Sequence, residues 1–510
     1  MKKPLAKKHI LLVAALLPVF AQAFSVSLAS DAAASGGVLD VWIVDGKIDG
    51  KSYYVVTQDV RLMPAGATFN GQIQIAAKDV VLEGNHCIID GADFHGDALS
   101  NNVPGMAWNS LYFPENTTRF FKYIGIVAQQ TNGVDQPAVD ISGTIIKNCI
   151  IKNWSNHGIY LRRVKEQDSN DFDGDGNLTE EIPEEAYFNG SDRGLLYKHA
   201  TRHIKLINME ITRNGRIENP ATGNLYATGD GIFVPAYSEF YFMQNLEVTE
   251  SGAVGIYLER ESRFSTIINC EIHHNWREGI AIDASAHNMI SHNELYYNNW
   301  VQDFPVRAGI KLYKNAGESG VKRYQHSSFN QIFHNTMHDE RTGVWVASRQ
   351  ASENAEERWN FNADELGEET FSYNGDDGTM MDYARHNVVA YNDFYNNAHS
   401  HVKVEDDFTV IVKNVFGNRD NGSGHTCDIN LGNPFRNERG RPVSGTAIVG
   451  NTWSTAATQT LLYDASIRTT SDELYSDDGI TSSDDAALDR KGIYSDWGYD
   501  GTGYLSDQLL

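Results

Sequence analysis

Five ionisable side chains recur at two fixed positions after a glycine and are the best candidates for chemistry. They are Tyr257, Glu259, Asp283, Lys311 and Tyr313. Each stands two or four residues after the glycine of a Gly-Ile motif. Because side chains alternate across a β-strand, both positions point to one face and the intervening residues point to the other. A lysine, two phenols and two carboxylates on one face can donate, accept and relay protons.

Aromatic and cationic side chains accompany this set and suggest a groove for a sugar chain. The second position in other copies of the motif is aromatic, as in Tyr160 and Phe233, and Ala281 leaves a dip between the larger residues. The residues that we predict to bind the substrate are Arg162, Arg307, His326, Arg341, Trp345 and Arg349. A concave patch with convergent ionisable groups is typical of a binding site. The competing interpretation is that the exterior of a repeat protein is polar everywhere. Any set of aligned outward positions would then contain some charged residues.

The glycine motif closes a repeated stretch that must build the strands carrying these residues. An Asn precedes the glycine by ten residues in three copies, which are Asn148 with Gly158, Asn245 with Gly255, and Asn269 with Gly279. A period of roughly 20–30 residues is the signature of a solenoid, whose turns bury their apolar face by stacking on one another. The Asn amide can bond the turn backbone and the same Asn one turn further on. The predicted Asn ladder comprises Asn148, Asn208, Asn245, Asn269, Asn293, Asn335, Asn392, Asn414 and Asn451.

The first and third residues after each glycine are aliphatic and are predicted to fill the interior of the coil. Examples are Ile256 with Leu258, Ile280 with Ile282, Ile310 with Leu312, and Val344 with Val346. Insertions at residues 165–200, 300–308, 316–327 and 352–384 interrupt the repeats, and insertions in solenoids tend to gather on one face, often the functional one. Residues 38–91 form short alternating runs, which we expect to be the opening turns.

This organisation resembles the right-handed parallel β-helix proteins, a group that contains polysaccharide lyases, glycoside hydrolases and uronate epimerases. The resemblance rests on the turn pattern around Asn148, Asn245 and Asn269 and extends over most of the chain. It implies an all-β, right-handed parallel β-helix with loop insertions on one face. Such a fold does not fix the chemistry. The β-helix alginate lyases use Lys or Arg with Tyr or His, so the resemblance suggests alginate as the leading substrate.

β-Elimination on a uronate polysaccharide, catalysed by a polysaccharide lyase, is the reaction that we favour. It requires a group that neutralises the substrate carboxylate, a base for the proton at C5 and an acid for the leaving oxygen. Lys311 is the candidate base if its surroundings favour the neutral amine, and Tyr257 or Tyr313 is the candidate acid. Arg307 or Arg349 would face the substrate carboxylate.

Three other functions are compatible with the same residues. Glu259 and Asp283 stand at equivalent positions in successive repeats, so their carboxyl groups could lie about 5 Å apart, as in a retaining glycoside hydrolase. Uronate C5-epimerisation shares the first half of elimination, but the Asp-Pro-His signature of bacterial mannuronan epimerases is absent from the sequence. A non-catalytic carbohydrate-binding solenoid would explain the aromatic residues but not the ionisable cluster.

Residues 171–182 begin like the calcium loop of an EF-hand. Oxygen donors occupy the first, third and fifth positions, a glycine the sixth and an apolar residue the eighth. The twelfth position is Ile182 instead of the usual Glu, so the loop is not a complete hand. Three aspartates at alternate positions repel one another without a cation. We therefore predict a structural Ca²⁺ ion, and its ligands would be Asp171, Asp173, Asp175, Asn177 and Glu181.

The first 23 residues are typical of a secretory signal peptide. Four lysines precede an apolar run over residues 10–20, which is too short to span a bilayer, and Ala21-Gln22-Ala23 forms a small-residue cleavage site. We therefore expect a secreted or periplasmic protein. The predicted domains are the signal peptide at 1–23, the β-helix at 24–455 and a cap or tail at 456–510.

The net charge and the cysteines limit the partners and the redox chemistry. Loss of the four leader lysines takes the net charge from −25 to −29, which argues against nucleic acid and anionic membranes as partners. An anionic polysaccharide remains compatible, because a local cationic groove outweighs distant surface charge at physiological screening. We expect a monomer without a membrane span. The four cysteines are too few for a disulfide scaffold, and we expect Cys149 and Cys270, which share a repeat position, to be small buried groups.

Overall fold

The computed structural model describes residues 37–92, 123–129, 139–161, 201–218, 225–227, 229–259, 262–298, 308–313, 327–347, 384, 386–406, 409–417, 427–431, 446–452 and 461–463. The chain divides into two units, Met1–Leu39 and Asp40–Leu510, and the coil described below lies in the second except for its first strand residue, Leu39. All the regular elements within these residues are β-strands. None of the described residues forms a helix long and apolar enough to cross a membrane. The signal peptide predicted at residues 1–23 lies outside the described residues.

The described strands belong to three sheets. The 12-stranded sheet contains β3 (Tyr53–Val56), β6 (Gln72–Ile75), β8 (Ile126–Ala128), β10 (Ile159–Tyr160), β14 (Ile232–Val234), β16 (Ile256–Leu258), β19 (Ile280–Asp283), β22 (Ile310–Tyr313), β25 (Thr342–Val346), β28 (Ser400–Val404), β31 (Cys427–Leu431) and β33 (Leu461–Tyr463). The 19-stranded sheet contains β1 (Leu39–Val44), β2 (Lys47–Ile48), β4 (Val60–Met63), β5 (Thr68–Phe69), β7 (Val81–Asp90), β9 (Ile145–Lys152), β11 (Lys205–Thr212), β15 (Phe242–Thr249), β17 (Thr266–Ile268), β18 (Glu271–His273), β20 (Met289–Ser291), β21 (Glu294–Tyr296), β23 (Gln331–Phe333), β24 (Thr336–His338), β26 (Val388–Ala390), β27 (Asp393–Tyr395), β29 (Val410–Val412), β30 (Val415–Phe416) and β32 (Ala447–Val449). A separate hairpin joins β12 (Arg216–Glu218) to β13 (Leu225–Ala227).

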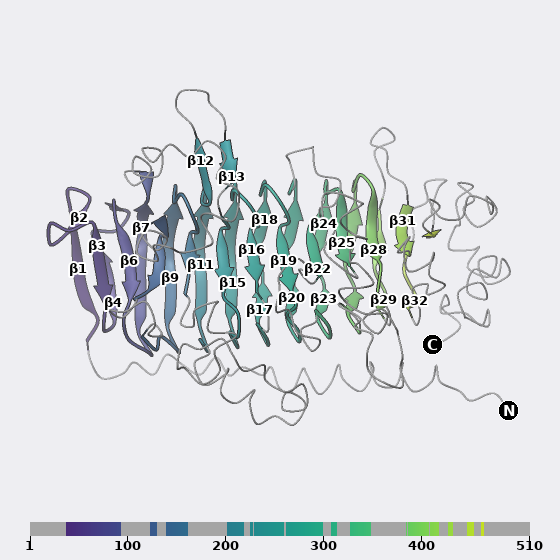
Figure 1. Ribbon diagram of the computed structural model, residues 1–510, viewed down its shortest axis with the longest axis horizontal. Helices are drawn as coiled ribbons and strands as arrows, with labels where there is room; N and C mark the ends of the chain where they lie inside the picture. The colour runs from purple at the N-terminus through teal and green to yellow at the C-terminus, as the bar shows by residue number, and fades with distance from the viewer. Residues whose placement is uncertain are drawn as a thin grey trace, which may run out of the picture. The chain divides into compact units, whose positions relative to one another are not determined.

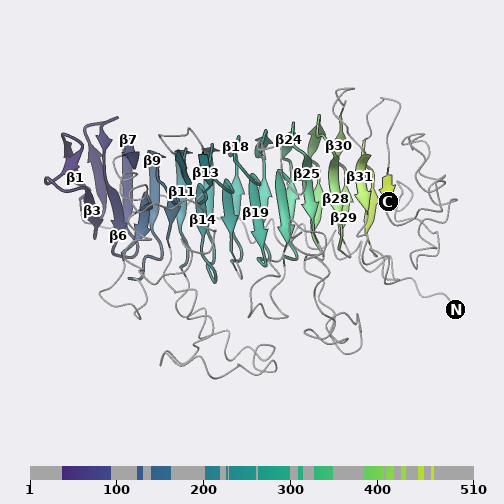
Figure 2. The same cartoon turned by 45° about the horizontal axis from the view of Figure 1, so that its top comes forward.

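The central part of the coil repeats a turn of three strands. One such turn consists of β17, β18 and β19, and each of these pairs in parallel with its counterpart in the next turn, β20, β21 and β22. Figures 1 and 2 show the strands of successive turns following one another along the coil. The stacking confirms the predicted all-β parallel β-helix. The pairing continues to β33 at residues 461–463, within the segment predicted to be a cap or tail.

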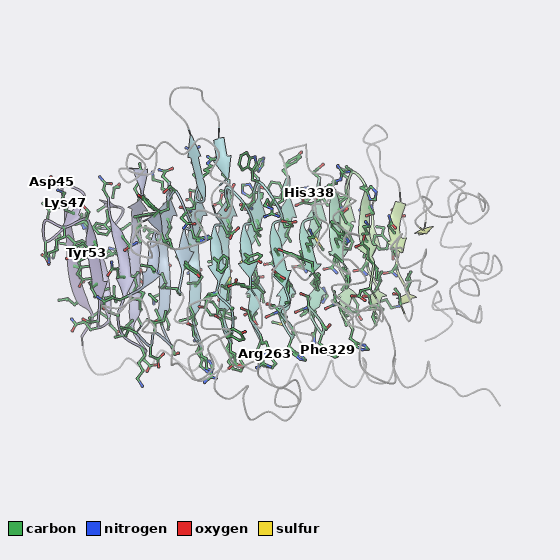
Figure 3. The ribbon with its side chains drawn as sticks, in the orientation of Figure 1. Asp45, Lys47, Tyr53, Arg263, Phe329 and His338 are labelled. Atoms are coloured by element: carbon green, nitrogen blue, oxygen red, sulfur yellow. The ribbon has the colours of Figure 1, made fainter. Side chains whose placement is uncertain are left out.

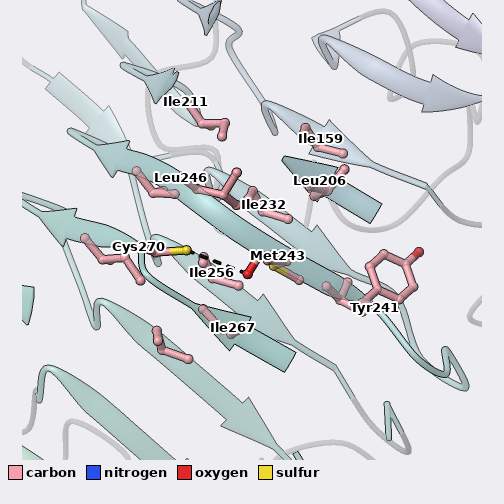
Figure 4. Close-up of a cluster of buried hydrophobic side chains, with 14 of the residues drawn as sticks. Ile159, Leu206, Ile211, Ile232, Tyr241, Met243, Leu246, Ile256, Ile267 and Cys270 are labelled. Carbon is pink, nitrogen blue, oxygen red and sulfur yellow. Dashed lines mark hydrogen bonds between the residues drawn. The ribbon is translucent and has the colours of Figure 1, made fainter. Parts of the chain in front are cut away.

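Aliphatic side chains fill the inside of the coil because alternate residues of each strand turn inward. Ile256, Leu258, Ile280 and Ile282 are completely buried, as predicted from their positions after the glycine. Figure 4 shows part of this core, which also contains Cys270. The three cysteines whose side chains are described are buried and free, as expected. Burial of stacked aliphatic rungs is the main favourable contribution to the stability of such a coil.

The recurrent glycine lets neighbouring turns approach closely where the strands that carry the candidate residues, β16, β19 and β22, begin. A β-carbon added to Gly279 would lie 2.9 Å from the carbonyl oxygen of Gly309 on the next turn. The same addition at Gly255 would lie 2.6 Å from the oxygen of Gly279. A side chain at either position would force the turns apart. This packing explains why the strand that carries the candidate residues always follows a glycine.

The predicted Asn ladder consists of two adjacent ladders. In the outer one, Asn208 Nδ2 donates to Asn148 Oδ1 over 3.2 Å and Asn245 Nδ2 donates to Asn208 Oδ1 over 2.9 Å. In the inner one, successive side-chain amides are linked over 2.9 to 3.0 Å, and the members are Asn293, Asn335, Asn392, Asn414 and Asn451. Amide-to-amide pairing between turns is therefore confirmed, but a single column is not.

The register explains this correction. Glu271 pairs with Glu294, so Asn269 lies opposite His292, and Asn293 lies opposite Cys270. The prediction that Asn269 and Asn293 share a position was therefore wrong by one residue. The outer position has a positive φ, 53° at Asn269 and 56° at His292, which Asn and His tolerate better than most residues. At this turn the residue in the inner position changes from the apolar Cys270 to Asn293.

A third ladder is interrupted by a buried carboxyl group. Asn275 Nδ2 donates to Asn298 Oδ1 over 2.9 Å, and Asn298 Nδ2 in turn donates to Glu340 Oε1 over 2.6 Å. Glu340 N donates to Asn397 Oδ1 over 3.0 Å, so Glu340 occupies the place of an Asn. Burial raises the pKa of Glu340 from 4.5 to about 8. Glu340 Oε2 has no hydrogen-bond partner among the described residues.

We expect Glu340→Gln to stabilise the protein at neutral and alkaline pH. Because the folded-state pKa is raised, the contribution of this carboxyl to stability is complete below pH 4.5 and is lost as the pH rises towards about 8. The amide cannot ionise, so at pH 8 the free energy of unfolding should increase by roughly 2–4 kcal/mol. Urea unfolding at pH 5 and pH 8 measures this, with the exposed Glu247→Gln as the control. An equal effect at both pH values would contradict the expectation.

Aromatic rings also line the exterior of the other walls. The rings of His287 and Phe329 are stacked with centroids 5.0 Å apart, and those of His338 and Tyr395 with centroids 4.5 Å apart. Figure 3 shows Phe329 and His338 projecting at opposite edges of the coil. Aromatic residues therefore occur on several faces, so they do not by themselves identify a binding face. Ionisable residues also lie on both large sheets, and the 12-stranded sheet differs in that its outward-facing Lys311 is nearly buried.

Candidate functional site

The strand register brings the predicted catalytic residues together on one wall. Tyr257 pairs with Ala281, Ala281 with Lys311, and Lys311 with Trp345. Asp283 pairs with Tyr313 in the same sheet. The two predicted columns therefore exist and run side by side on the outer face of the 12-stranded sheet.

These outward side chains are shielded from solvent. Lys311 and Trp345 each expose 2% of their surface, and Tyr257 is half-buried. Tyr313, Trp345 and Ala281 belong to a small apolar cluster that is separate from the main core. We expected these side chains to be exposed in an open groove, and the structure shows them largely buried instead. Burial strengthens the electrostatic interactions between them because little water is present to screen the charges.

Lys311 lies between two aromatic rings and beside a carboxylate. Its Nζ atom is 4.7 Å from the ring centroid of Tyr313 and 4.6 Å from that of Trp345. Glu278 Oε1 is 3.4 Å from the same nitrogen. Cation–π contacts and an ion pair both favour the protonated ammonium group. This environment suits a residue that attracts an anion better than one that must give up its charge to act as a base.

Tyr257 and Asp283 form a tight hydrogen-bonded pair. Tyr257 Oη donates to Asp283 Oδ2 over 2.6 Å. Burial, together with the negative charge of Asp283, raises the pKa of Tyr257 well above its usual value. Burial followed by the charges of Asp283 and Glu278 does the same for the pKa of Tyr313. Both phenols therefore keep their protons at neutral pH, and Asp283 is positioned to receive one.

Glu259 lies one turn before Asp283, just beyond the end of β16, and is nearly buried. Its Oε2 atom accepts a hydrogen bond of 3.0 Å from the backbone N–H of Ala236. Because adjacent strands lie about 4.8 Å apart, Glu259 and Asp283 start from neighbouring rungs of the same column. The hydrogen bond at Ala236 turns one oxygen of Glu259 towards the backbone.

A second row of ionisable residues, which we did not predict from the sequence, directly precedes the recurrent glycine. They are His157, Asp230 and Glu278, and Arg277 lies beside the last of them with its Nε atom 3.8 Å from Glu278 Oε2. The backbone N–H of Asp230 donates to His157 Nδ1 over 3.0 Å. Burial lowers the pKa of His157 to about 3 and raises that of Asp230 to about 7. Extending the repeat alignment one residue before the glycine would have revealed this row.

The remaining predicted ligands are mostly outside the described residues. Arg341 lies directly before β25 and is half-buried. The other predicted substrate-binding residues, Arg162, Arg307, His326 and Arg349, lie outside the described residues, as do the predicted calcium ligands Asp171, Asp173, Asp175, Asn177 and Glu181. Within the described ranges no group of three or more His, Cys, Asp or Glu residues is arranged to hold a metal ion.

Comparison with known proteins supports the fold. The family model described as "Right handed beta helix region" matches residues 107–356. No curated protein matches the sequence. Solved structures with a similar fold include the A-module of mannuronan C-5 epimerase AlgE4 from Azotobacter vinelandii, at 12% identity and a TM-score of 0.41, covering 79% of this chain and 81% of that one.

Two further structures show the same low level of similarity. DFA-IIIase from Arthrobacter chlorophenolicus A6, without its lid, is 12% identical with a TM-score of 0.40, covering 80% of this chain and 81% of that one. Alginate lyase from Paenibacillus sp. str. FPU-7 is 11% identical with a TM-score of 0.33, covering 79% of this chain and 84% of that one. Similarity at this level does not indicate the function of this chain.

Proposed function

We propose that this chain, a right-handed parallel β-helix, is a polysaccharide lyase that cleaves a uronate polysaccharide by β-elimination on the outer face of its 12-stranded sheet. Alginate is the first candidate substrate. The observation that supports this most is the enclosed ammonium group of Lys311, held between Tyr313 and Trp345 with Glu278 beside it. A nearly buried charge is costly unless it is paired, and a charge kept on a ligand-facing wall suits an anionic ligand.

Elimination assigns a role to each group of the cluster. Lys311 attracts the substrate carboxylate and so stabilises the negative charge that develops when the C5 proton leaves. Tyr257 Oη takes that proton while passing its own to Asp283 Oδ2, to which it is already hydrogen-bonded. Tyr313 donates its proton to the leaving oxygen. The C5–H and C4–O bonds break, a C4–C5 double bond forms, and the proton on Asp283 later restores that of Tyr313.

In this assignment Lys311 stabilises the developing negative charge and is no longer the base that we predicted from the sequence. A base must be unprotonated before the reaction, and the two aromatic rings and Glu278 beside Lys311 favour its charged form. Tyr313 suits the role of acid because its raised pKa keeps the proton on the phenol until the leaving oxygen develops negative charge.

Hydrolysis by Glu259 and Asp283 is the second candidate, because the two carboxyl groups occupy the same column on adjacent turns. Their spacing of about 5 Å would fit a retaining mechanism. Against it, Asp283 is engaged by Tyr257, and Glu259 accepts a bond from Ala236 N. Epimerisation and simple carbohydrate binding use the same face, and the products distinguish all four functions.

A product survey tests the proposed function. The protein is incubated separately with alginate, pectate and glycosaminoglycans, while ultraviolet absorbance of the unsaturated product and the release of reducing ends are recorded. We expect both signals to rise together with alginate. Reducing ends without new absorbance would indicate hydrolysis, a changed uronate composition without shortening would indicate epimerisation, and binding without any product would indicate a binding protein. Any of these three results would contradict the lyase proposal.

We also propose that the loop at residues 171–182 binds Ca²⁺. Three aspartates at alternate positions supply the hard oxygen ligands that Ca²⁺ prefers. Terbium luminescence should show saturable binding that calcium displaces. The double variant Asp171→Asn/Asp173→Asn should lose it, whereas Asp339→Asn, elsewhere on the coil, should not. Equal luminescence from the double variant and the wild type would rule out this site.

A further inference from the structure

Lys403 forms a second cationic position on the same wall as Lys311. The two lysines pair with opposite sides of Trp345, because β25 lies between β22 and β28 in the sheet. Lys403 Nζ is 4.6 Å from the indole centroid, the same distance as Lys311 Nζ. Trp345 is therefore in contact with an ammonium group from each neighbouring turn.

Lys403 is held in place and partly accessible. Its Nζ lies 2.7 Å from Glu405 Oε1, and 17% of its side-chain surface is exposed. The backbone N–H of Glu405 donates to the carbonyl of Val346 over 2.8 Å, which fixes the residue that orients the lysine. An ammonium group has three donors, so one bond to Glu405 leaves capacity for a ligand.

Trp345 adds an unused donor between the two cations. Its Nε1 atom is buried and has no hydrogen-bond acceptor among the described residues. A buried donor without an acceptor costs free energy that a ligand oxygen would recover. The two ammonium groups and the indole N–H are together suited to the carboxylates and hydroxyl oxygens of a polyuronate chain.

We propose that Lys403, with Trp345, forms a second carboxylate subsite for the substrate of the proposed lyase. Lys311 and Lys403 lie two turns apart, about 10 Å along the coil axis, which is comparable to two residues of an extended 1,4-linked polyuronate. The substrate chain then runs along the wall, with one carboxylate at Lys311 and the carboxylate of the next residue but one at Lys403. The inference rests on the proposed function. It adds the axis along which the substrate chain lies and a minimum length for a substrate that reaches both lysines.

Steady-state kinetics with alginate oligosaccharides tests the subsite. A hexasaccharide can reach both lysines, whereas a disaccharide cannot. We expect Lys403→Met to raise KM for the hexasaccharide about tenfold while kcat stays within twofold. The disaccharide should show no change in KM. Lys403→Arg keeps the cation and should restore most of the affinity. Lys205→Met, an exposed lysine on β11 in the other large sheet, is the matched control and should behave like the wild type.

The outcomes separate this inference from the proposed function. Thermal unfolding of each variant shows whether it is folded, and Lys403→Arg gives a second measurement if Lys403→Met is not. Wild-type cleavage of alginate with an unchanged KM in folded Lys403→Met would overturn the subsite and leave the lyase proposal intact. A wild-type protein that neither binds nor cleaves the hexasaccharide would overturn both.

Discussion

Lys311→Ala should lower kcat/KM for alginate by about 10²–10³-fold while the protein remains folded. The ammonium group lies on the outer side of the 12-stranded sheet, between two rings and beside Glu278. Its removal takes away the positive charge that we assign to the carboxylate at the reacting residue. The negative charge that builds up as C5 loses its proton would then be opposed by Glu278 and Asp283 instead of being stabilised. Initial rates from the ultraviolet absorbance of the product measure the effect.

Two companion variants separate charge from packing. Lys311→Met keeps most of the apolar volume between Tyr313 and Trp345 but removes the charge, so we expect a loss similar to that of Lys311→Ala. Glu278→Gln removes the partner of the ammonium group and leaves the charge, so we expect a loss of less than tenfold. A fully active Lys311→Met would show that the lysine serves only to pack the two rings.

Tyr313→Phe should lower kcat by about 10²–10⁴-fold with little change in KM, because the phenol donates the proton to the leaving oxygen. The ring and its contact with Lys311 remain in this variant, so the loss reports the hydroxyl group alone. Burial and the nearby carboxylates raise the pKa of Tyr313, so its proton is retained throughout the neutral range. In the wild type, kcat measured from pH 6 to pH 9 should therefore not fall at the alkaline end through ionisation of Tyr313.

The comparison with Glu259→Gln distinguishes elimination from hydrolysis. In the elimination mechanism Glu259 is a neighbour of the reacting groups, and its amide replacement should cost less than tenfold in kcat. In a two-carboxylate hydrolase, Glu259→Gln and Asp283→Asn would both abolish turnover. A Tyr313→Phe variant with full activity, together with an inactive Glu259→Gln variant, would favour hydrolysis.

The repeat was enough to predict the fold and the position of the cluster. Aliphatic residues at the first and third positions after each glycine predicted the inner face, and Ile280 and Ile282 are completely buried. The same alternation placed Tyr257, Ala281 and Lys311 in one column, as the strand register confirms. This part of the prediction succeeded because side chains alternate between the two faces of a strand and the glycine marks where each strand begins. Together these two features assign every residue to one face.

Features that depend on contacts between turns could not be predicted in this way. The Asn column changed position between Asn269 and Asn293 because both the outer and the inner position of the turn accept Asn, and the sequence spacing differs by only one residue. Glu278 was missed because it precedes the strand, where alternation no longer applies. The contacts of Lys311 include the rings of Tyr313 and Trp345, which come from its own strand and from the next turn.

The most direct test of the central claim is to compare how strongly kcat/KM depends on the substrate carboxylate in the wild type and in Lys311→Met. kcat/KM is measured for alginate oligosaccharides and for their methyl esters, with the wild type and with Lys311→Met. If the Lys311 ammonium group acts on the carboxylate, the wild type should prefer the free acid by at least tenfold and the variant should lose that preference. An unchanged preference in the variant would contradict the account.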